Sequence, residues 1–162
     1  MHNHLIPVLR EDHAVLQELV RQVQSTTADF RKKQRLTNDL YLSLNGHLAI
    51  VENTVLPLLY AVSGKDLPDM FATHCENLRE QLSDLLAQRT HATGLHATLN
   101  VLCQALSLHI KREALFLIPA IDRVLDADER AHQALQSCER AARDGRKGLF
   151  DQATAYPHSL AC

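Results

Sequence analysis

A repeated pattern of histidine and proline constrains the fold of this chain more than any other sequence feature. Two stretches, HLAIVENTVLP beginning at His47 and HIKREALFLIP beginning at His109, each place a proline ten positions after a histidine. Each histidine also has an upstream counterpart at nearly the same distance, because His13 precedes His47 by 34 residues and His74 precedes His109 by 35. Such self-similarity is typical of a repeated structural unit. The sequence therefore predicts two units built on one plan.

The same histidines lie on the apolar stripes of four predicted helices. Apolar residues recur at steps of three and four, the period of an α-helix with one buried face. The predicted helices run from just after Pro7 to about residue 24, from just after residue 30 to residues 63–64, from about residue 66 to about residue 90, and through residues 99–116. With only five glycines and five prolines, the chain has little turn chemistry for a many-stranded fold. We expect an all-α protein, an antiparallel four-helix bundle with one histidine on each helix.

The length of the chain predicts one domain spanning residues 1–162. The core bundle is expected at about residues 5–125. A more charged amphipathic stretch at about residues 127–144 predicts an additional C-terminal helix on the outside, followed by a C-terminal tail.

Composition argues against several classes of function. The formal net charge is −2 and acids and bases are mixed along the chain, so we expect neither nucleic acid nor an anionic membrane as a partner. No stretch approaches the roughly 20 apolar residues of a membrane span, and the start lacks a signal-peptide pattern, which predicts a cytoplasmic protein. The four cysteines are scattered without CxxC spacing and are interpreted as free thiols. Oligomeric state is not indicated.

Histidines on an apolar stripe require partners. An unpaired polar group in a core costs on the order of 1–3 kcal/mol, and one metal ion satisfies several imidazoles at once. Glu113 follows His109 by four residues, about 40° around the helix, so both side chains can ligate from one face. Imidazole and carboxylate ligands favour iron, manganese or zinc. The sequence thus predicts a metal site, with non-haem iron as the leading candidate and zinc or manganese as alternatives.

These residues resemble the hemerythrin-like family, the HHE cation-binding domains. The resemblance covers about residues 5–125 and rests on the two histidine-to-proline stretches and the upstream histidines. It implies a non-haem di-iron centre held by histidine, His-x-x-x-Glu, histidine and His-x-x-x-Glu from four successive helices. The matching positions are His13, His47, His74, His109 and Glu113.

One position departs from the family pattern. Where the first His-x-x-x-Glu would place its glutamate, this chain has Val51, and the acid falls at the next residue, Glu52. In a regular helix Glu52 points about 100° away from the ligand position, whereas a local π-bulge would bring it inward as a sixth ligand. The missing carboxylate predicts an atypical centre with fewer ligands, which is mononuclear, asymmetric, or completed by water or an exogenous anion.

The resemblance implies a metal-binding protein that binds or senses a small diatomic ligand such as dioxygen or nitric oxide, or that handles iron. Loss of a carboxylate at Val51 weighs against efficient two-iron catalysis, and the sequence does not decide whether the protein is an enzyme. The alternative from a different class is a metal-free regulatory or interaction bundle with a degenerate site. Val51 favours this alternative, while Glu113 and the four histidines favour the metal site.

Overall fold

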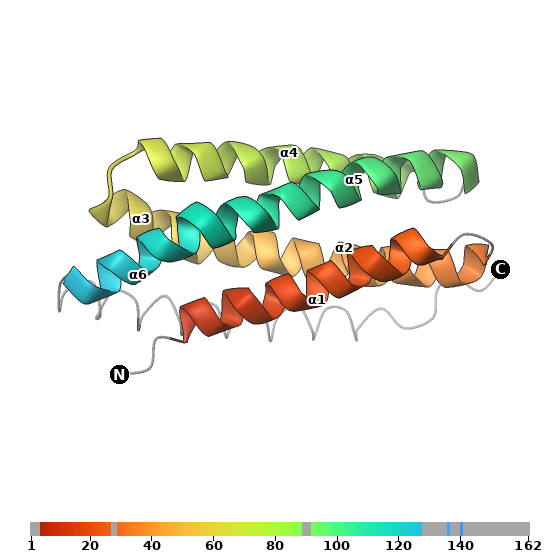
Figure 1. The fold of residues 1–162 in the computed structure, drawn as a ribbon. Helices are drawn as coiled ribbons and strands as arrows, with labels where there is room; N and C mark the ends of the chain where they lie inside the picture. Colours follow the sequence, from red (N-terminus) through yellow and green to blue (C-terminus); the bar gives the residue numbers. More distant parts are fainter. Residues whose placement is uncertain (1–3, 27–28, 89–91, 128–135, 137–139, 141–162) are drawn as a thin grey trace.

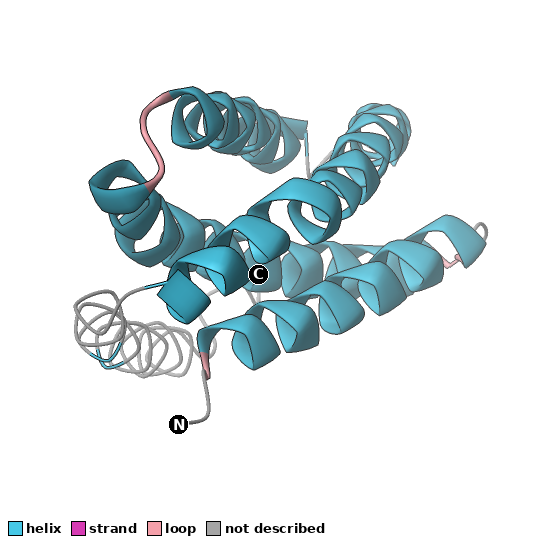
Figure 2. Ribbon diagram, turned by 60° about the vertical axis from the view of Figure 1, so that its left-hand side comes forward, coloured by secondary structure: helices cyan, strands magenta, loops and turns pink. Residues whose placement is uncertain are grey.

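The computed structural model describes residues 4–26, 29–88 and 92–127, together with Gln136 and Arg140. Within these residues every element is a helix, and no strand is present (Figure 2). The predicted all-α class is thereby confirmed for the described part of the chain. The additional helix predicted at about 127–144 and the C-terminal tail lie outside the described residues, except for the three described positions Ala127, Gln136 and Arg140.

The helices form four rods joined by short connections (Figure 1). In chain order the elements are α1 (Leu5–Ser25), α2 (Phe30–Ile50), η1 (Val51–Val55), α3 (Leu56–Val62), α4 (Asp66–Gln88), α5 (Ala92–Arg112), η2 (Glu113–Leu117) and α6 (Ile118–Ala127). The elements α2, η1 and α3 follow one another without a break, as do α5, η2 and α6. Successive rods run in opposite directions, so the histidine-bearing stretches from distant parts of the chain come side by side (Figure 1).

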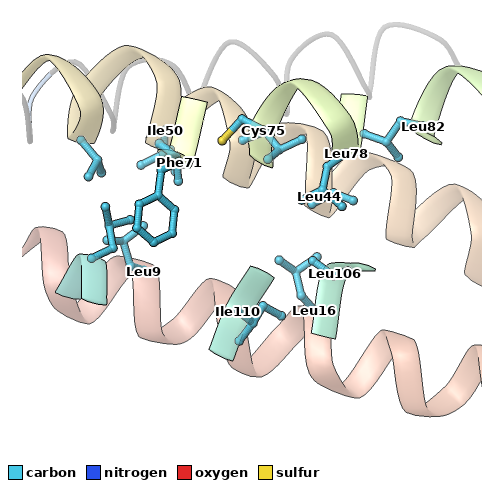
Figure 3. Packing of buried hydrophobic residues seen from close by; sticks show 14 of the residues in the cluster. Leu9, Leu16, Leu44, Ile50, Phe71, Cys75, Leu78, Leu82, Leu106 and Ile110 are labelled. Atoms are coloured by element: carbon cyan, nitrogen blue, oxygen red, sulfur yellow. The ribbon is translucent and has the colours of Figure 1, made fainter. Parts of the chain in front are cut away.

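The apolar stripes of the rods meet in one core. Helix α1 packs against α2 and α5, and α4 packs against α5. Figure 3 shows side chains from facing rods pointing toward one another in this core. Fully buried residues with an exposed fraction of 1% or less include Leu9, Leu16, Leu44, Phe71, Leu99, Leu102 and Leu106. Burial of apolar area at roughly 25 cal/mol per Å² is what holds the helices together.

Local signals set the ends of two helices. The Asp29 side chain accepts a hydrogen bond from the Lys32 backbone N–H at 2.8 Å, which caps the start of α2. Between α3 and α4, Gly64 adopts a φ of 78°, a left-handed conformation that favours glycine. The chain can therefore turn sharply at this point, and α4 returns along the bundle.

The two π-helical turns, η1 and η2, stand at matching places in the repeat. The backbone N–H of Leu56 donates to Val51, and that of Ile118 donates to Glu113, each closing the wider i→i+5 turn. Each π turn ends two residues before the repeated proline. A proline has no N–H to donate to the helix, so the widened turn lies close to a residue that interrupts the regular bonding pattern.

The outward faces of the rods carry polar residues and some exposed apolar side chains. Val101 on α5 is 57% exposed and Leu115 on η2 is 67% exposed. Among the described helices, none combines the length and apolarity needed to cross a membrane.

Neighbouring positions on α5 provide a test of the core. Leu102 is fully buried whereas Val101 is mostly exposed. We expect Leu102→Ala to lower the free energy of unfolding by about 2–5 kcal/mol, because it leaves a cavity in a packed core. The control Val101→Ala should change it by no more than about 0.5 kcal/mol. Urea unfolding followed by circular dichroism measures both, and equal losses would contradict this packing.

Candidate metal centre

Four of the predicted site residues converge in the middle of the bundle. His13 comes from α1, His47 from α2, His109 from α5 and Glu113 from the first position of η2. All four are buried, with exposed fractions of 7%, 1%, 3% and 0%. Because the three rods that carry them pack together, residues as far apart in sequence as His13 and Glu113 become neighbours.

The Glu113 carboxylate lies at the centre of this cluster. Its Oε2 is 2.6 Å from His13 Nε2 and 3.1 Å from His47 Nε2. Its Oε1 is 3.1 Å from His109 Nε2. One carboxylate thus faces three imidazoles, two on one oxygen and one on the other.

The geometry of three of these residues suits a metal ion. Ligand atoms of His13, His47 and Glu113 all lie within 4.8 Å of one another, so a single ion can contact all three. Two imidazoles and a carboxylate are nitrogen and oxygen ligands of the kind that favour iron, manganese or zinc. A buried group that can hold a metal ion is therefore present, and it includes three of the predicted ligands.

Some polar atoms of the cluster lack hydrogen-bond partners within the described structure. They include both ring nitrogens of His109 and the Oε1 atom of Glu113. A buried polar atom without a partner is costly, and such atoms gathered around a carboxylate are what a metal ion would satisfy. The residues present therefore fit a metal ion.

The charges of the cluster depend on one another. Burial alone would raise the pKa of Glu113, but the charge of His47 and the hydrogen bonds from His13 and His47 hold it well below its usual value. Burial alone would lower the pKa of His47, but the Glu113 charge, together with Asp12, raises it to about 9. Without metal, the centre holds an ionised glutamate and a protonated His47.

Asp12 stands behind His47 on the side away from Glu113. Its Oδ2 lies 3.5 Å from His47 Nδ1, and its side chain is half-buried. A carboxylate at the outer nitrogen of a histidine fixes the ring so that the other nitrogen faces inward. Sequence reasoning did not single out Asp12, although its position directly before His13 on the same helix was visible.

His74 lies beside the cluster but is not among the residues that contact Glu113. It comes from α4, is half-buried, and its Nε2 accepts a hydrogen bond from Arg112 Nη1 at 2.8 Å. Its ring lies 6.4 Å from that of His109, measured between centroids. Burial, Arg112 and His109 all lower its pKa, so the ring is neutral and can accept this bond. Sequence reasoning did not foresee the contact with Arg112, since no spacing rule links α4 to α5.

The first repeat places no acid in the cluster. Val51, at the predicted glutamate position, is fully buried. The π turn that would bring Glu52 inward is present as η1, yet Glu52 lies against Arg79 of α4 instead. Arg79 Nε donates to Glu52 Oε1 at 2.9 Å, and Arg79 Nη1 donates to Asn45 at 2.6 Å. The structure therefore keeps Glu52 in an ion pair at the edge of the bundle, whereas Glu113 begins the equivalent π turn inside it.

Apolar and aromatic side chains enclose the cluster. The Phe71 ring on α4 is fully buried, and its centroid lies 5.7 Å from that of His74 and 6.3 Å from that of His109. Figure 3 shows Phe71 pointing into the core between Leu9 and Ile50. This surrounding strengthens electrostatic interactions within the centre by excluding water.

Of the other histidines and cysteines that the structure describes, His96, Cys75 and Cys103 take no part in the cluster. His96 on α5 accepts a hydrogen bond from the buried Lys33 at 2.7 Å. Cys75 and Cys103 are buried free thiols, and burial raises their pKa values to about 12 and about 11. These two thiols are therefore protonated and unreactive at neutral pH.

Comparison with known proteins does not extend this description. No protein-family model, no curated protein sequence and no solved structure matches the chain.

The raised pKa of His47 makes the stability of the metal-free protein depend on pH. Because the pKa rises from 6.5 to about 9 on folding, protonated His47 stabilises the fold fully below pH 6.5, and this contribution is lost as the pH rises through 9. The lowered pKa of Glu113 acts in the opposite sense, stabilising the fold above about pH 4.5. Chelator-treated protein should therefore lose stability between pH 6.5 and 9 in urea unfolding.

The variant His47→Gln should remove this dependence, while His96→Gln, at an exposed position on α5, should retain it. A wild-type protein whose stability is constant from pH 6.5 to 9 would contradict the charge state described for the cluster.

Asp12 supplies a second test. The variant Asp12→Asn removes the charge behind His47 while keeping the size of the side chain. We expect it to weaken metal binding by roughly 10- to 100-fold, the usual cost of losing an outer partner of a metal-bound histidine. Glu11→Gln, an exposed neighbour on α1, is the control and should leave the affinity unchanged. Isothermal titration measures both, and an unaltered affinity in Asp12→Asn would exclude a positioning role.

Proposed function

We propose that this protein binds a transition-metal ion in the interior of the bundle, held by His13, His47 and Glu113, with His109 beside them. The observation that carries the proposal is the buried Glu113 carboxylate, which faces three imidazoles and has its Oε1 without a hydrogen-bond partner. Buried charges are rare in proteins unless they are paired with an opposite charge or coordinate a metal. A cluster with this composition is better explained by a metal than by packing.

Non-haem iron is the metal we propose, with zinc or manganese as alternatives. Two histidines and one carboxylate form the ligand set that iron(II) oxygenases use with open coordination positions, and carboxylate and imidazole ligands also suit manganese and zinc. The resemblance to hemerythrin-like domains and to their antiparallel four-helix bundle points to the same metal. The ligand set and this resemblance support the assignment jointly.

The ligand that would complete the centre is a small molecule. Three protein ligand atoms leave coordination positions open, and a bound metal would supply a place for dioxygen or nitric oxide to attach. The side chains of the cluster are buried, at most 7% exposed, which keeps bulk water from them. A role in binding or sensing a diatomic ligand, or in handling iron, follows from a metal with open positions in an apolar enclosure.

A metal-free regulatory bundle is the second candidate, favoured by one observation. His13 Nε2 and His47 Nε2 both reach Glu113 Oε2, so part of the cluster satisfies its own polar groups without a metal. Val51 supplies no second carboxylate. In this alternative the charged cluster only orients the helices, and metal would not change stability.

The glutamates in the two π turns are a matched pair for testing the proposal. We expect wild-type protein purified without chelator to contain metal and Glu52→Gln to retain it, because Glu52 pairs with Arg79 outside the cluster. Glu113→Gln removes a proposed metal ligand. It should weaken metal binding by more than roughly 100-fold, the loss expected for a residue that only hydrogen-bonds to a ligand. Elemental analysis identifies the metal, and isothermal titration of the chelator-treated proteins with Fe²⁺ under anaerobic conditions gives the affinities.

The same samples separate the two candidate functions. A metal that binds only the folded state raises the midpoint of thermal unfolding in wild-type protein and in Glu52→Gln. The metal-site proposal is overturned in favour of the metal-free bundle by two results together. The purified wild-type protein would contain no metal, and its unfolding midpoint would be unaffected by Fe²⁺, Mn²⁺ and Zn²⁺.

A further inference from the structure

The two oxygens of Glu113 face unequal surroundings. Oε2 is within 3.1 Å of ring nitrogens from both His13 and His47. Oε1 is within that distance of His109 only, at 3.1 Å, and neither Oε1 nor His109 Nε2 has a hydrogen-bond partner in the described structure. One side of the carboxylate therefore has the ligands for an ion, while the other has a single imidazole.

The next imidazole beyond His109 is His74, whose ring centroid lies 6.4 Å from that of His109, and Arg112 holds it. Arg112 is the last residue of α5, directly before Glu113, and its Nη1 donates to His74 Nε2 at 2.8 Å. Arginine has no deprotonated form at accessible pH, so it is always a donor. The lone pair of His74 Nε2 is therefore used by the guanidinium, and the ring proton is on Nδ1.

A metal ion and Arg112 compete for that same lone pair. The guanidinium also places a permanent positive charge next to the position that a second cation would take, and like charges a few ångströms apart in a partly buried site repel strongly. The first π turn offers no compensating anion, because Val51 is apolar and Glu52 pairs with Arg79. Both the lone pair and the charge balance disfavour a second ion.

We propose that Arg112 restricts the centre to one metal ion, by occupying His74 and by supplying the positive charge that a second ion would otherwise bring. This inference rests on the proposed metal-binding function and specifies its stoichiometry. Arg112 is a positioning residue whose side chain acts through its hydrogen bond to His74.

The test is the number of ions bound by variants of Arg112. Chelator-treated protein is titrated with Co²⁺ alone, with equivalents counted by isothermal titration and coordination followed by the visible spectrum. Wild-type protein should bind one equivalent. Arg112→Met, which removes the charge and the donors but keeps the aliphatic stem, should bind a second, and the double variant with His74→Ala should return to one. Arg123→Met, an exposed arginine on α6, is the matched control and should bind one.

A second measurement reports on His74 without metal. In ¹⁵N nuclear magnetic resonance spectra of the metal-free protein, the His74 ring should show a protonated Nδ1 and an accepting Nε2 in the wild type. These signals should change in Arg112→Met and not in Arg123→Met. Unchanged signals would overturn the claim that Arg112 holds this ring.

The outcomes separate this inference from the function it rests on. If wild type and Arg112→Met each bind one equivalent, and circular dichroism shows that both are folded, then Arg112 does not limit the number of ions. The proposed metal site is unaffected by that result. Two equivalents bound by wild type overturn the restriction equally. No Co²⁺ bound by either protein overturns the metal site and the restriction together.

Discussion

The centre of this structure depends on a carboxylate with no access to solvent. Glu113 is fully buried, and the cost of removing its charge from water is offset only by the imidazoles that α1, α2 and α5 bring to it. Each of those helices must therefore keep its histidine facing inward. The apolar core provides most of the stabilising free energy, but the charged cluster specifies the rotation of these three rods about their axes.

Much of this arrangement could be predicted from the sequence. The steps of three and four that place His13, His47 and His109 on apolar stripes also bury them, since a helix with one apolar face turns that face to the core. The four-residue spacing of His109 and Glu113 placed both on one side of α5 and η2. These are consequences of helical period alone, which is why the sequence sufficed.

The remainder depends on contacts between rods, which no helical period describes. His74 satisfies the same pattern as the other histidines, yet its Nε2 meets Arg112 from another helix. Glu52 has the π turn that could have brought it inward, but Arg79 of α4 offers a nearer partner at the edge of the bundle. Asp12 likewise acquires its role only when α2 lies against α1. In all three cases the residue that the side chain contacts is distant in sequence.

The paired π turns have a consequence for how the repeat tolerates change. A π turn carries one residue more than the α-helical turn it replaces, so η1 and η2 each shift the phase of the residues after them by about 100°. The helical phase that turns residues to the core therefore differs before and after each π turn. This applies to α2 and α3 in one rod and to α5 and α6 in another. The charged cluster can keep its contacts while the distal ends repack, and the apolar Val51 in one half need not disturb the helix that continues beyond it.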